Sequence, residues 1–398
     1  MIDLTSIPAT TLDSNYSTTK ILIELFDDKF KLDKKQEIGI NSDFKANYFV
    51  SKIKNSYLVD ELGNASKAFT FLAHVKTKMN DGGLRKKGYF KFSYKYIDIN
   101  NDNGKKGWFV VNNSDDLVIP VEMPYELISM PRLPLITIIT VVYNGVKYIE
   151  KTIQNVISQN YLNVEYIIID GESDDGTLDI IKKYEDKIDY WLSENDKGIY
   201  DAMNKGIDLA NGKWICFMNS GDRFWDANVI EKVFEKEYKD SGVIYGDHVA
   251  VYGKQKIVCK PKEISEIYKH MCFSHQSSFI NTSLMKSLKY NTDFKIAGDY
   301  EFFLRCYYKK QIKFDYAKIL ISCVQAEMGM SYDNILLSLC ENFKANWLLN
   351  TKPKSILVKY YLLRFFYLFI VIIFKIKYLS KLKGFIRSLR FQEIKEYE

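Results

Sequence analysis

The sequence predicts an α/β fold built on a mainly parallel, doubly wound sheet. Two observations support this prediction. Between residues 135 and 325, short apolar runs of strand length alternate with segments whose apolar residues have helical spacing. Three of the apolar runs are followed by polar or acidic residues, at Asn144, Asp170 and Asp222. Ligands bind along the carboxyl ends of the strands in open α/β sheets, so we expect the functional site at this edge.

The expected elements alternate in order through this region. Asp196 and Asp226 can cap helices, and Asn211-Gly212 can end one. A hairpin is expected over 249–259, with its turn at Gly253-Lys254. The expected strands are 135–143, 164–170, 190–192, 214–218 and 243–245. The expected helices are 147–159, 177–184, 198–210, 228–238 and 298–310.

The flanking regions have a different character. Four of the seven prolines lie at 120, 124, 131 and 134, which predicts a linker over 120–134. The strand-like runs at 89–97 and 108–111, with an Asn-Asp-Asn-Gly turn signal between them, indicate some β structure in an accessory region. The predicted division is 1–119 accessory region, 120–134 linker, 135–330 α/β domain and 331–398 C-terminal helices.

Charge is concentrated at the C-terminal end of the chain. The 398 residues carry a net charge of +6, of which residues 352–398 supply a local +8. The remainder is near neutral, so nothing indicates nucleic-acid binding by the body. Six cysteines without a CxxC pair favour reduced thiols in a cytosolic protein. The first residues lack the basic and apolar regions of a secretory signal.

The C-terminal region contains a helical segment at 334–349 and a strongly apolar segment at 356–376. The second is long enough to span a bilayer, but Lys359 and Arg364 lie inside it, and buried cations are costly in a membrane. A helix lying in the interface lets both cations reach water, with the following basic residues against anionic lipid. We expect peripheral attachment to the cytosolic face. A true span and a packed core or dimer helix are the alternatives.

Asp170 ends an apolar strand and is followed by Gly171. A carboxylate there can accept a hydrogen bond from the N3–H of uracil or thymine, or from a ribose hydroxyl. Asp174 and Asp175 precede a helix, so helix capping is open for both. Capping would still fix the loop that holds a base.

Asp222 follows Asn219-Ser220-Gly221 at the end of the third apolar run. Mg²⁺ usually takes one or two protein carboxylates, so a single Asp can suffice for a cation on a diphosphate. A strand-end Gly-Asp also occurs in turns. Lys197-Gly198 opens a helix, where an ammonium and backbone N–H groups can face an anion, and a capped surface helix is the alternative.

Asp299 begins the helix expected at 298–310. It can act as the base that deprotonates an incoming hydroxyl, or it can only cap the helix. His275 lies on the approach to a strand, where it can take part in a site or be a structural hydrogen-bond donor.

Together, six motifs closely resemble the family 2 glycosyltransferases, which are inverting enzymes of GT-A fold in bacterial polysaccharide assembly. The resemblance covers about 135–330. GLRKKGYFK (83–91) resembles the lead-in of some members, although here about forty further residues precede the first strand. The six motifs are ITVVYNG (139–145), IIDGESDDGT (168–177), DKGIYDAMNKG (196–206), FMNSGD (217–222), HQSSF (275–279) and GDYEFFLR (298–305).

The resemblance implies a nucleotide-sugar site. Asn144 would lie in the first nucleotide loop, Asp170 would hold the base, and Asp175 would support its loop. Ser220 replaces the first Asp of the family's Asp-x-Asp metal motif, which leaves Asp222 as the single protein carboxylate on Mg²⁺ or Mn²⁺. Further implied donor contacts are Val142, Tyr143, Ser173, Asp196, Lys197, Gly198, Asn204, Ser220 and Gly221.

The implied reaction is one displacement, in which Asp299 removes the acceptor proton and inversion follows. The expected donor is a UDP-sugar, and the expected acceptor is a saccharide, lipid-linked in O-antigen or capsule synthesis. His275 and Gln276 are expected to contact acceptor or phosphate, and whether the chain forms a homo-oligomer is open. Alternatives are a non-catalytic nucleotide-sugar or glycan-binding module, and a sugar-phosphate nucleotidyltransferase, whose Gly-rich signature is missing near the chain start.

Overall fold

The computed structural model describes residues 19–21, 36–40, 49–52, 80–87, 89–91, 93–97, 107–111, 117–121, 132–253, 255–325 and 334–373. The strands are β1 (Thr19–Ile21), β2 (Gln36–Ile40), β3 (Phe49–Lys52), β4 (Asp81–Gly82), β5 (Tyr89–Phe90), β6 (Ser93–Ile97), β7 (Gly107–Val111), β8 (Leu117–Val121), β9 (Arg132–Leu133), β10 (Ile136–Val142), β11 (Val164–Asp170), β12 (Tyr190–Ser193), β13 (Trp214–Phe217), β14 (Arg223–Phe224), β15 (Ser241–Tyr252), β16 (Gln255–Cys259), β17 (Ser278–Asn281) and β18 (Lys313–Gln325).

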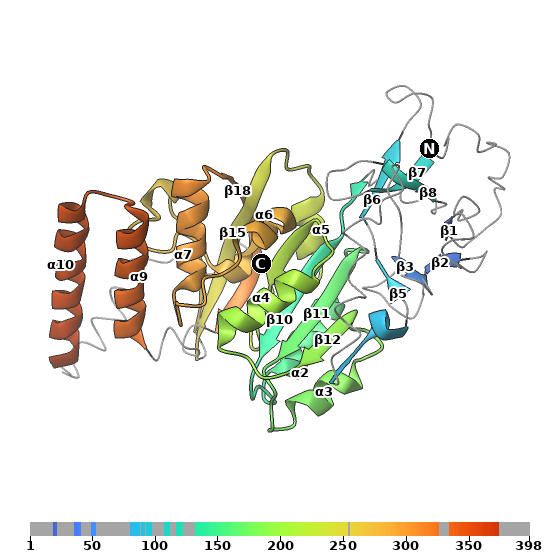
Figure 1. The fold of residues 1–398 in the computed structure, drawn as a ribbon, viewed down its shortest axis with the longest axis horizontal. Helices are drawn as coiled ribbons and strands as arrows, with labels where there is room; N and C mark the ends of the chain where they lie inside the picture. Colours follow the sequence, from blue (N-terminus) through green and yellow to red (C-terminus); the bar gives the residue numbers. More distant parts are fainter. Residues whose placement is uncertain are drawn as a thin grey trace.

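The described helices cover the sheet, and some of them lie beyond one of its ends (Figure 1). The α-helices are α2 (Ile149–Ile157), α3 (Thr177–Lys183), α4 (Ile199–Leu209), α5 (Val229–Phe234), α6 (Thr282–Leu288), α7 (Gly298–Leu304), α9 (Ile335–Leu349) and α10 (Lys354–Ile373). The short helical turns are the 3₁₀ segments η5 (Leu84–Lys87), η7 (Ile264–Glu266) and η8 (His275–Ser277), and the π segment η9 (Arg305–Lys309).

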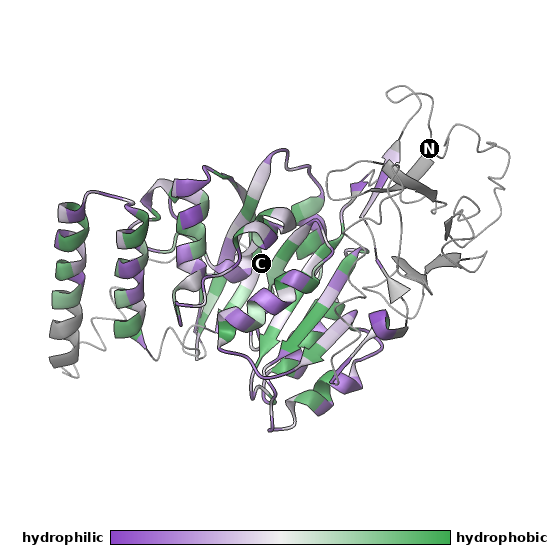
Figure 2. Ribbon diagram, in the orientation of Figure 1, coloured by the Kyte–Doolittle hydropathy of each residue, from purple (hydrophilic) through white to green (hydrophobic). Residues whose placement is uncertain are grey.

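Four parallel strands form the centre of a ten-stranded sheet, in the order β13-β10-β11-β12. Every residue of β10 and β11 is buried, as expected where helices cover both faces of a parallel sheet. Figure 2 shows these strands as mostly hydrophobic. Val142 pairs with Asp170, so the ends of β10 and β11 reach the same edge. The predicted α/β fold with a doubly wound parallel core is confirmed.

Two helices illustrate how the sequence builds the core. In α2 the buried residues include Ile149, Ile153 and Val156, which lie on one face because they recur at helical spacing. In α4, Gly206 faces Ile139 so closely that a Cβ would lie 2.6 Å from its Cγ2. Only glycine therefore lets α4 approach β10 at this point.

The other half of the sheet is mixed. β17 runs antiparallel to both β13 and β15, whereas β15 and β18 are parallel to each other. The expected hairpin at 249–259 is present as β15 and β16. The expected helix at 228–238 ends at Phe234, and the one at 298–310 changes to a π segment after Leu304. Hydrophobic spacing therefore located these elements but not their ends.

A short segment before the expected linker belongs to the same sheet. β4 pairs antiparallel with the edge strand β12, through Asp81 with Leu192 and Gly82 with Trp191. The backbone N–H groups of Leu84 and Arg85 continue the contact by donating to the carbonyls of Ile188 and Asp189. Residues 80–85 thus extend the α/β sheet, although they precede its first strand by about fifty residues.

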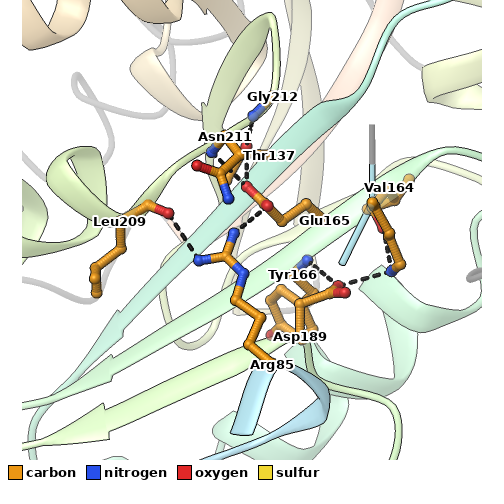
Figure 3. A network of polar contacts seen from close by, with 10 residues as sticks. Arg85, Thr137, Val164, Glu165, Tyr166, Asp189, Leu209, Asn211 and Gly212 are labelled. Carbon is orange, nitrogen blue, oxygen red and sulfur yellow. Dashed lines mark hydrogen bonds and ion pairs between the residues drawn. The ribbon is translucent and has the colours of Figure 1, made fainter. Parts of the chain in front are cut away.

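A buried ion pair anchors this segment beneath the sheet (Figure 3). Arg85 pairs with Glu165 of β11, and both side chains are about 2% exposed. Arg85 Nη1 also donates to the carbonyl of Leu209, 2.8 Å away. The second Glu165 oxygen accepts from Thr137 Oγ1 at 2.6 Å and from the Asn211 N–H at 2.8 Å. Every charge in this cluster therefore has hydrogen-bonding partners.

A second buried pair lies beside the first. Lys91 Nζ lies 2.7 Å from Asp189 Oδ2 and 2.5 Å from the carbonyl of Val164. The same Asp189 oxygen accepts the Tyr166 N–H at 2.7 Å. Burial lowers the pKa of Lys91 and raises that of Asp189, while their mutual attraction opposes both shifts. The pair holds the chain close to the sheet after η5.

The remaining N-terminal strands form an eight-stranded sheet in the order β5-β3-β2-β1-β8-β7-β6-β9. β9, within the expected linker, pairs with β6. The turn expected at 101–104 lies outside the described residues. The division of the chain into domains stays a prediction.

α9 and α10 follow α7 in a row at one end of the molecule (Figure 1). Leu339 of α9 packs with Leu357 and Tyr361 of α10. Several large apolar side chains on these helices are exposed, including Leu362, Leu363 and Phe366 at 62 to 63%. Among the described residues, no helix has the length and apolarity needed to cross a membrane. The expected apolar segment at 356–376 lies partly outside the described chain.

Candidate active site

Asp170 lies at the carboxyl end of β11 and is fully buried. Its Oδ1 accepts from Ser173 Oγ at 2.5 Å, and its Oδ2 accepts from Ser193 Oγ at 2.7 Å and from the Ser173 N–H at 3.1 Å. These bonds tie the ends of β11 and β12 to the loop that follows. The geometry gives Asp170 a role in shaping the loop, and its direct contact with a base stays a prediction.

The loop after β10 is held against the same segment. Asn144 has a φ of 49°, and its N–H donates to Ser173 Oγ at 2.8 Å while its Oδ1 accepts from the Asp174 N–H at 3.1 Å. Asp175 accepts from the Val146 N–H and from Thr177. Partial desolvation disfavours the exposed Asp175 carboxylate, but these hydrogen bonds hold its pKa below the ordinary value. The two expected nucleotide loops thus form one hydrogen-bonded unit.

Tyr143 is 67% exposed at the end of β10, directly after the buried Val142. Its ring lies near Gly171, where a Cβ would sit 3.3 Å from Tyr143 Cδ2 and 2.6 Å from Asp196 Oδ2. The strand ends therefore bring Tyr143, Gly171 and Asp196 together. An exposed aromatic ring at this edge is available to stack on a base.

The segment before α4 bends sharply at Gly198, whose φ is 121°. Asp196 Oδ1 accepts the Gly198 N–H at 2.8 Å, and Asp201 Oδ2 accepts the Lys197 N–H at 3.0 Å. Asn204 lies deeper, where it exchanges two hydrogen bonds of 2.9 Å with the backbone of Tyr290. That exchange gives Asn204 a structural function, and its predicted donor contact has no support from these bonds.

Asp222 is buried, 8% exposed, where the chain turns after β13. Its Oδ2 accepts from Gln276 Nε2 at 2.9 Å, and its Oδ1 faces the Gln325 N–H at 3.3 Å. Burial raises the pKa of Asp222 to about 6, against the lowering effects of Gln276 and His275. The preceding Gly221 has a φ of 100°, so the turn favours glycine.

Asp299 opens α7 and faces His275. His275 Nδ1 lies 3.0 Å from Asp299 Oδ2, and the Tyr300 N–H donates to Asp299 Oδ1 at 2.8 Å. The Tyr200 hydroxyl lies 3.2 Å from the same Oδ1. Burial disfavours the Asp299 carboxylate, but the contacts with His275, Tyr300 and Tyr200 outweigh it and lower its pKa. Asp299 is therefore held as a carboxylate.

His275 and Gln276 join the two halves of the site. An Nδ1–H on His275 that donates to Asp299 leaves Nε2 as an acceptor, and Nε2 faces Asn219 Nδ2 at 3.4 Å. Gln276 contacts Asp222 from the same turn. Three motifs that are far apart in sequence thus form one network from Asp222 to Asp299.

Oxygen atoms beside Asp222 fit a divalent cation. Asn219 Oδ1 and Ser220 Oγ are buried without a hydrogen-bond partner among the described residues. With the Asp222 carboxylate they supply the oxygen donors that Mg²⁺ and Mn²⁺ accept. The described residues contain no group of three or more His, Cys, Asp or Glu that could hold a metal ion. A cation here would depend on substrate oxygens as well.

Two contributors to the site were missed from the sequence. The backbone of Gln325, at the end of β18, reaches Asp222, and Glu341 of α9 accepts hydrogen bonds from the residues before Asp299. Neither lies in a recognisable motif. Backbone contacts and long-range tertiary packing carry no local signal that could have indicated them.

The family model described as Glycosyl transferase family 2 matches residues 137–310. An uncharacterized glycosyltransferase of Mycobacterium tuberculosis (strain CDC 1551 / Oshkosh) is 32% identical over 190 residues, which are 44% of this chain and 70% of that protein. The chain belongs to glycosyltransferase family 2. The predicted family and the prediction of a transferase are confirmed.

This family 2 glycosyltransferase is also similar to two further proteins, over a smaller share of their length. A Bacillus subtilis (strain 168) protein named as a teichuronic acid biosynthesis glycosyltransferase, TuaG, is 40% identical over 107 residues, 26% of this chain and 41% of that protein. The structure of S. aureus TarS 1–349 with UDP-GlcNAc has a TM-score of 0.44 and 18% identity, over 54% of this chain and 65% of that one.

Proposed function

We propose that this glycosyltransferase moves a sugar from a nucleotide-sugar donor, a UDP-sugar, to a saccharide hydroxyl with inversion. The observation that supports the proposal best is the Asp299 carboxylate, which His275 holds within one network with Asp222. A carboxylate that stays ionised beside a buried, cation-compatible group suits base and leaving-group assistance at the two ends of one displacement.

The donor would bind along the strand ends. Tyr143 would stack on the base, and the unit of Asn144, Ser173 and Asp175 would set the shape of the nucleotide pocket. Asp170 would act through Ser173 and Ser193, because its own oxygens already accept three hydrogen bonds. Lys197 and Gly198 would face the diphosphate.

Asp299 would accept the proton of the acceptor hydroxyl while that oxygen forms its bond to the anomeric carbon. The bond from this carbon to the diphosphate oxygen breaks, and both electrons leave with the diphosphate. His275 remains hydrogen-bonded to Asp299 and keeps it oriented. One carboxylate suffices because inversion needs no protein nucleophile.

Asp222, with the oxygens of Asn219 and Ser220, would hold Mg²⁺ or Mn²⁺. When bound, the cation would supply stabilisation of the charge that develops on the departing diphosphate. Gln276 would orient the Asp222 carboxylate, and burial of the group would keep bulk water from competing for it.

We further propose that the acceptor is a lipid-linked saccharide in cell-surface glycan synthesis, at the cytosolic face of the membrane. The name of the relative TuaG supports a surface glycan. Exposed apolar side chains on α10, with the basic residues that follow, support attachment to a lipid surface.

The test combines a donor screen with two variants. Nucleotide sugars are screened by thermal shift with and without Mn²⁺, and the donors that bind are assayed for transfer. Asp299→Asn is expected to lower transfer by about 10² to 10⁴-fold with donor binding retained. Asp222→Ala is expected to remove the Mn²⁺ dependence of donor binding and most transfer.

Asp208→Asn serves as the matched control, because Asp208 is an exposed acid that pairs with Lys289 away from the network. Full transfer by both site variants would overturn the assignment. Donor binding without transfer to any acceptor, in the unaltered chain, would instead support a non-catalytic binding module.

A further inference from the structure

Glu341 of α9 accepts hydrogen bonds from three consecutive backbone N–H groups. Its Oε1 lies 2.8 Å from the N–H nitrogen of Lys295, and its Oε2 lies 2.9 Å from those of Ile296 and Ala297. The side chain is buried and lies outside the region matched by the family model. α7 begins at the next residue, Gly298, and Asp299 follows.

We infer that Glu341 is a positioning residue for Asp299, and that α9 and α10 together hold the pair of Asp299 and His275. The inference rests on the proposed role of Asp299 as base. Charge-assisted hydrogen bonds to backbone N–H groups are stronger than neutral ones, so three of them fix the backbone from which Asp299 projects.

The path from Glu341 to Asp299 has little freedom. The Tyr200 hydroxyl donates to the Ile296 carbonyl at 2.6 Å, so Ile296 is held from both sides. A Cβ on Gly298 would lie 2.7 Å from the Tyr200 ring. A shift of residues 295–297 would therefore move Asp299 relative to both Tyr200 and His275.

α10 holds the other partner. Tyr360 Oη and Arg364 Nη1 both donate to the carbonyl of Lys269 at 2.9 Å, six residues before His275. Arg364 also donates to Tyr360 Oη at 3.3 Å. α10 therefore holds the chain at Lys269, on the approach to His275, as α9 holds the residues directly before α7.

The two helices are joined by a shared amide. Asn346 of α9 donates from Nδ2 to the hydroxyls of Tyr300 at 2.9 Å and Tyr361 at 3.0 Å. Tyr300 in turn donates to the carbonyl of Ile267 at 2.7 Å. α7, α9, α10 and the approach to His275 thus form one polar assembly, in which the C-terminal helices set the distance between base and histidine.

The experiment measures kcat and KM with the donor found in the screen for the unaltered chain, Glu341→Ala, Glu341→Gln and Leu339→Ala. Leu339 is buried on the same helix and packs on Leu357 and Tyr361, so its truncation removes apolar contacts of α9 but leaves the hydrogen bonds of Glu341 and Asn346 in place. Glu341→Ala is expected to lower kcat by about 10²-fold with the donor KM within about twofold.

The kcat of Glu341→Gln is expected to lie between those of the unaltered chain and of Glu341→Ala. Its side-chain oxygen can still accept, but its NH₂ group would face a backbone N–H group. Leu339→Ala is expected to keep kcat at a temperature below its own unfolding midpoint. Equal kcat losses in Leu339→Ala and Glu341→Ala, or no loss in the latter, would overturn the inference. Full activity in Asp299→Asn would instead contradict the proposed function, and it therefore separates a failure of that proposal from a failure of the inference about Glu341.

A second readout needs no activity. The chain has four histidines, so the ring nitrogen signals of His275 can be assigned by NMR with His275→Gln. Glu341→Ala is expected to shift these signals, because Asp299 moves relative to Nδ1. Unchanged His275 signals in Glu341→Ala would overturn the inference whether or not transfer is detected.

Discussion

At the scale of single residues, the pairing of His275 with Asp299 determines how the site responds to pH. The lowered pKa of Asp299 means that its carboxylate is present through the neutral and mildly acidic range. In His275→Ala the burial of Asp299 remains while its strongest partner is lost. The pKa of Asp299 is then expected to rise, because burial alone favours the protonated acid.

The prediction is that kcat/KM of His275→Ala falls at a higher pH than that of the unaltered chain as the solution is acidified. At neutral pH we expect a loss of about 10- to 100-fold, because the base is less well oriented. The measurement is the pH profile of kcat/KM for both chains. An acid limb at the same pH in the two chains would contradict the role given to His275.

His248, on β15, links a residue to pH-dependent stability. Its Nδ1 is buried without a hydrogen-bond partner among the described residues, and burial lowers its pKa to about 4. An unfolded histidine titrates near pH 6.5, so between these two values the unfolded chain binds more protons and the folded state loses stability as pH falls.

The prediction is that His248→Gln loses less unfolding free energy on acidification from about pH 6.5 to 4.5 than the unaltered chain, by roughly 1 to 2 kcal/mol. The measurement is the urea midpoint at several pH values. His270 also has a pKa lowered to about 4, so His270→Gln provides a comparison at an independent position. Parallel pH curves for His248→Gln and the unaltered chain would contradict the prediction.

At the scale of elements, the sheet depends on a strand that the sequence did not indicate. Arg85 lies just after this strand, in η5, and Arg85→Ala would leave the Glu165 carboxylate of β11 buried without its cation. Removal of one partner from a buried ion pair costs about 3 to 5 kcal/mol, and we expect a loss of that size in unfolding free energy. Denaturant titration measures it.

The surface pair of Lys183 and Glu150 offers the matched control for Arg85→Ala. Both side chains are well exposed, so Lys183→Ala should leave the unfolding midpoint nearly unchanged. A similar loss in the two variants would mean that the Arg85 pair does not hold the edge of the sheet.

Elements with long, regular hydrophobic spacing could be predicted from the sequence, and β10, β11, α2 and α4 lie where expected. β4 could not be predicted, because its two residues are too few to show a periodicity. Its pairing with β12 also depends on residues far away in the sequence. The antiparallel direction of β17 could not be predicted either, because the composition of an apolar run does not indicate which way the strand runs in the sheet.

In the candidate site too, some features could be predicted from the sequence and others could not. Asp170, Asp222, His275 and Asp299 were found because each lies in a motif at a strand or helix end, and the structure brings the last three into one network. The hydrogen bonds that bury Asp170, and those that tie Asn204 to Tyr290, depend on side-chain directions in the folded chain. No sequence spacing encodes them.

At the scale of the whole molecule, the net positive charge is concentrated in the C-terminal part of the sequence. The body is near neutral, whereas residues 352–398 carry a local +8. We predict that the chain binds vesicles with anionic lipid, at about 1 kcal/mol for each basic residue near the surface, and that added salt weakens this binding. Co-sedimentation measures it.

A chain ending at residue 373 serves as the comparison, because it lacks the basic residues that follow α10. It should retain transfer to a soluble acceptor but lose most of its affinity for anionic vesicles. Equal binding of the full chain to neutral and anionic vesicles would contradict an electrostatic attachment.

The buried pairs of Arg85 and Lys91 also set an order of events during synthesis. Glu165 follows Arg85 by 80 residues, and Asp189 follows Lys91 by 98. At about 5 to 20 residues per second, the two cations leave the ribosome several seconds before the carboxylates that neutralise them. The segment that carries Arg85 and Lys91 therefore stays solvated until β11 and β12 have emerged. We expect β4 to pair with β12 late during translation.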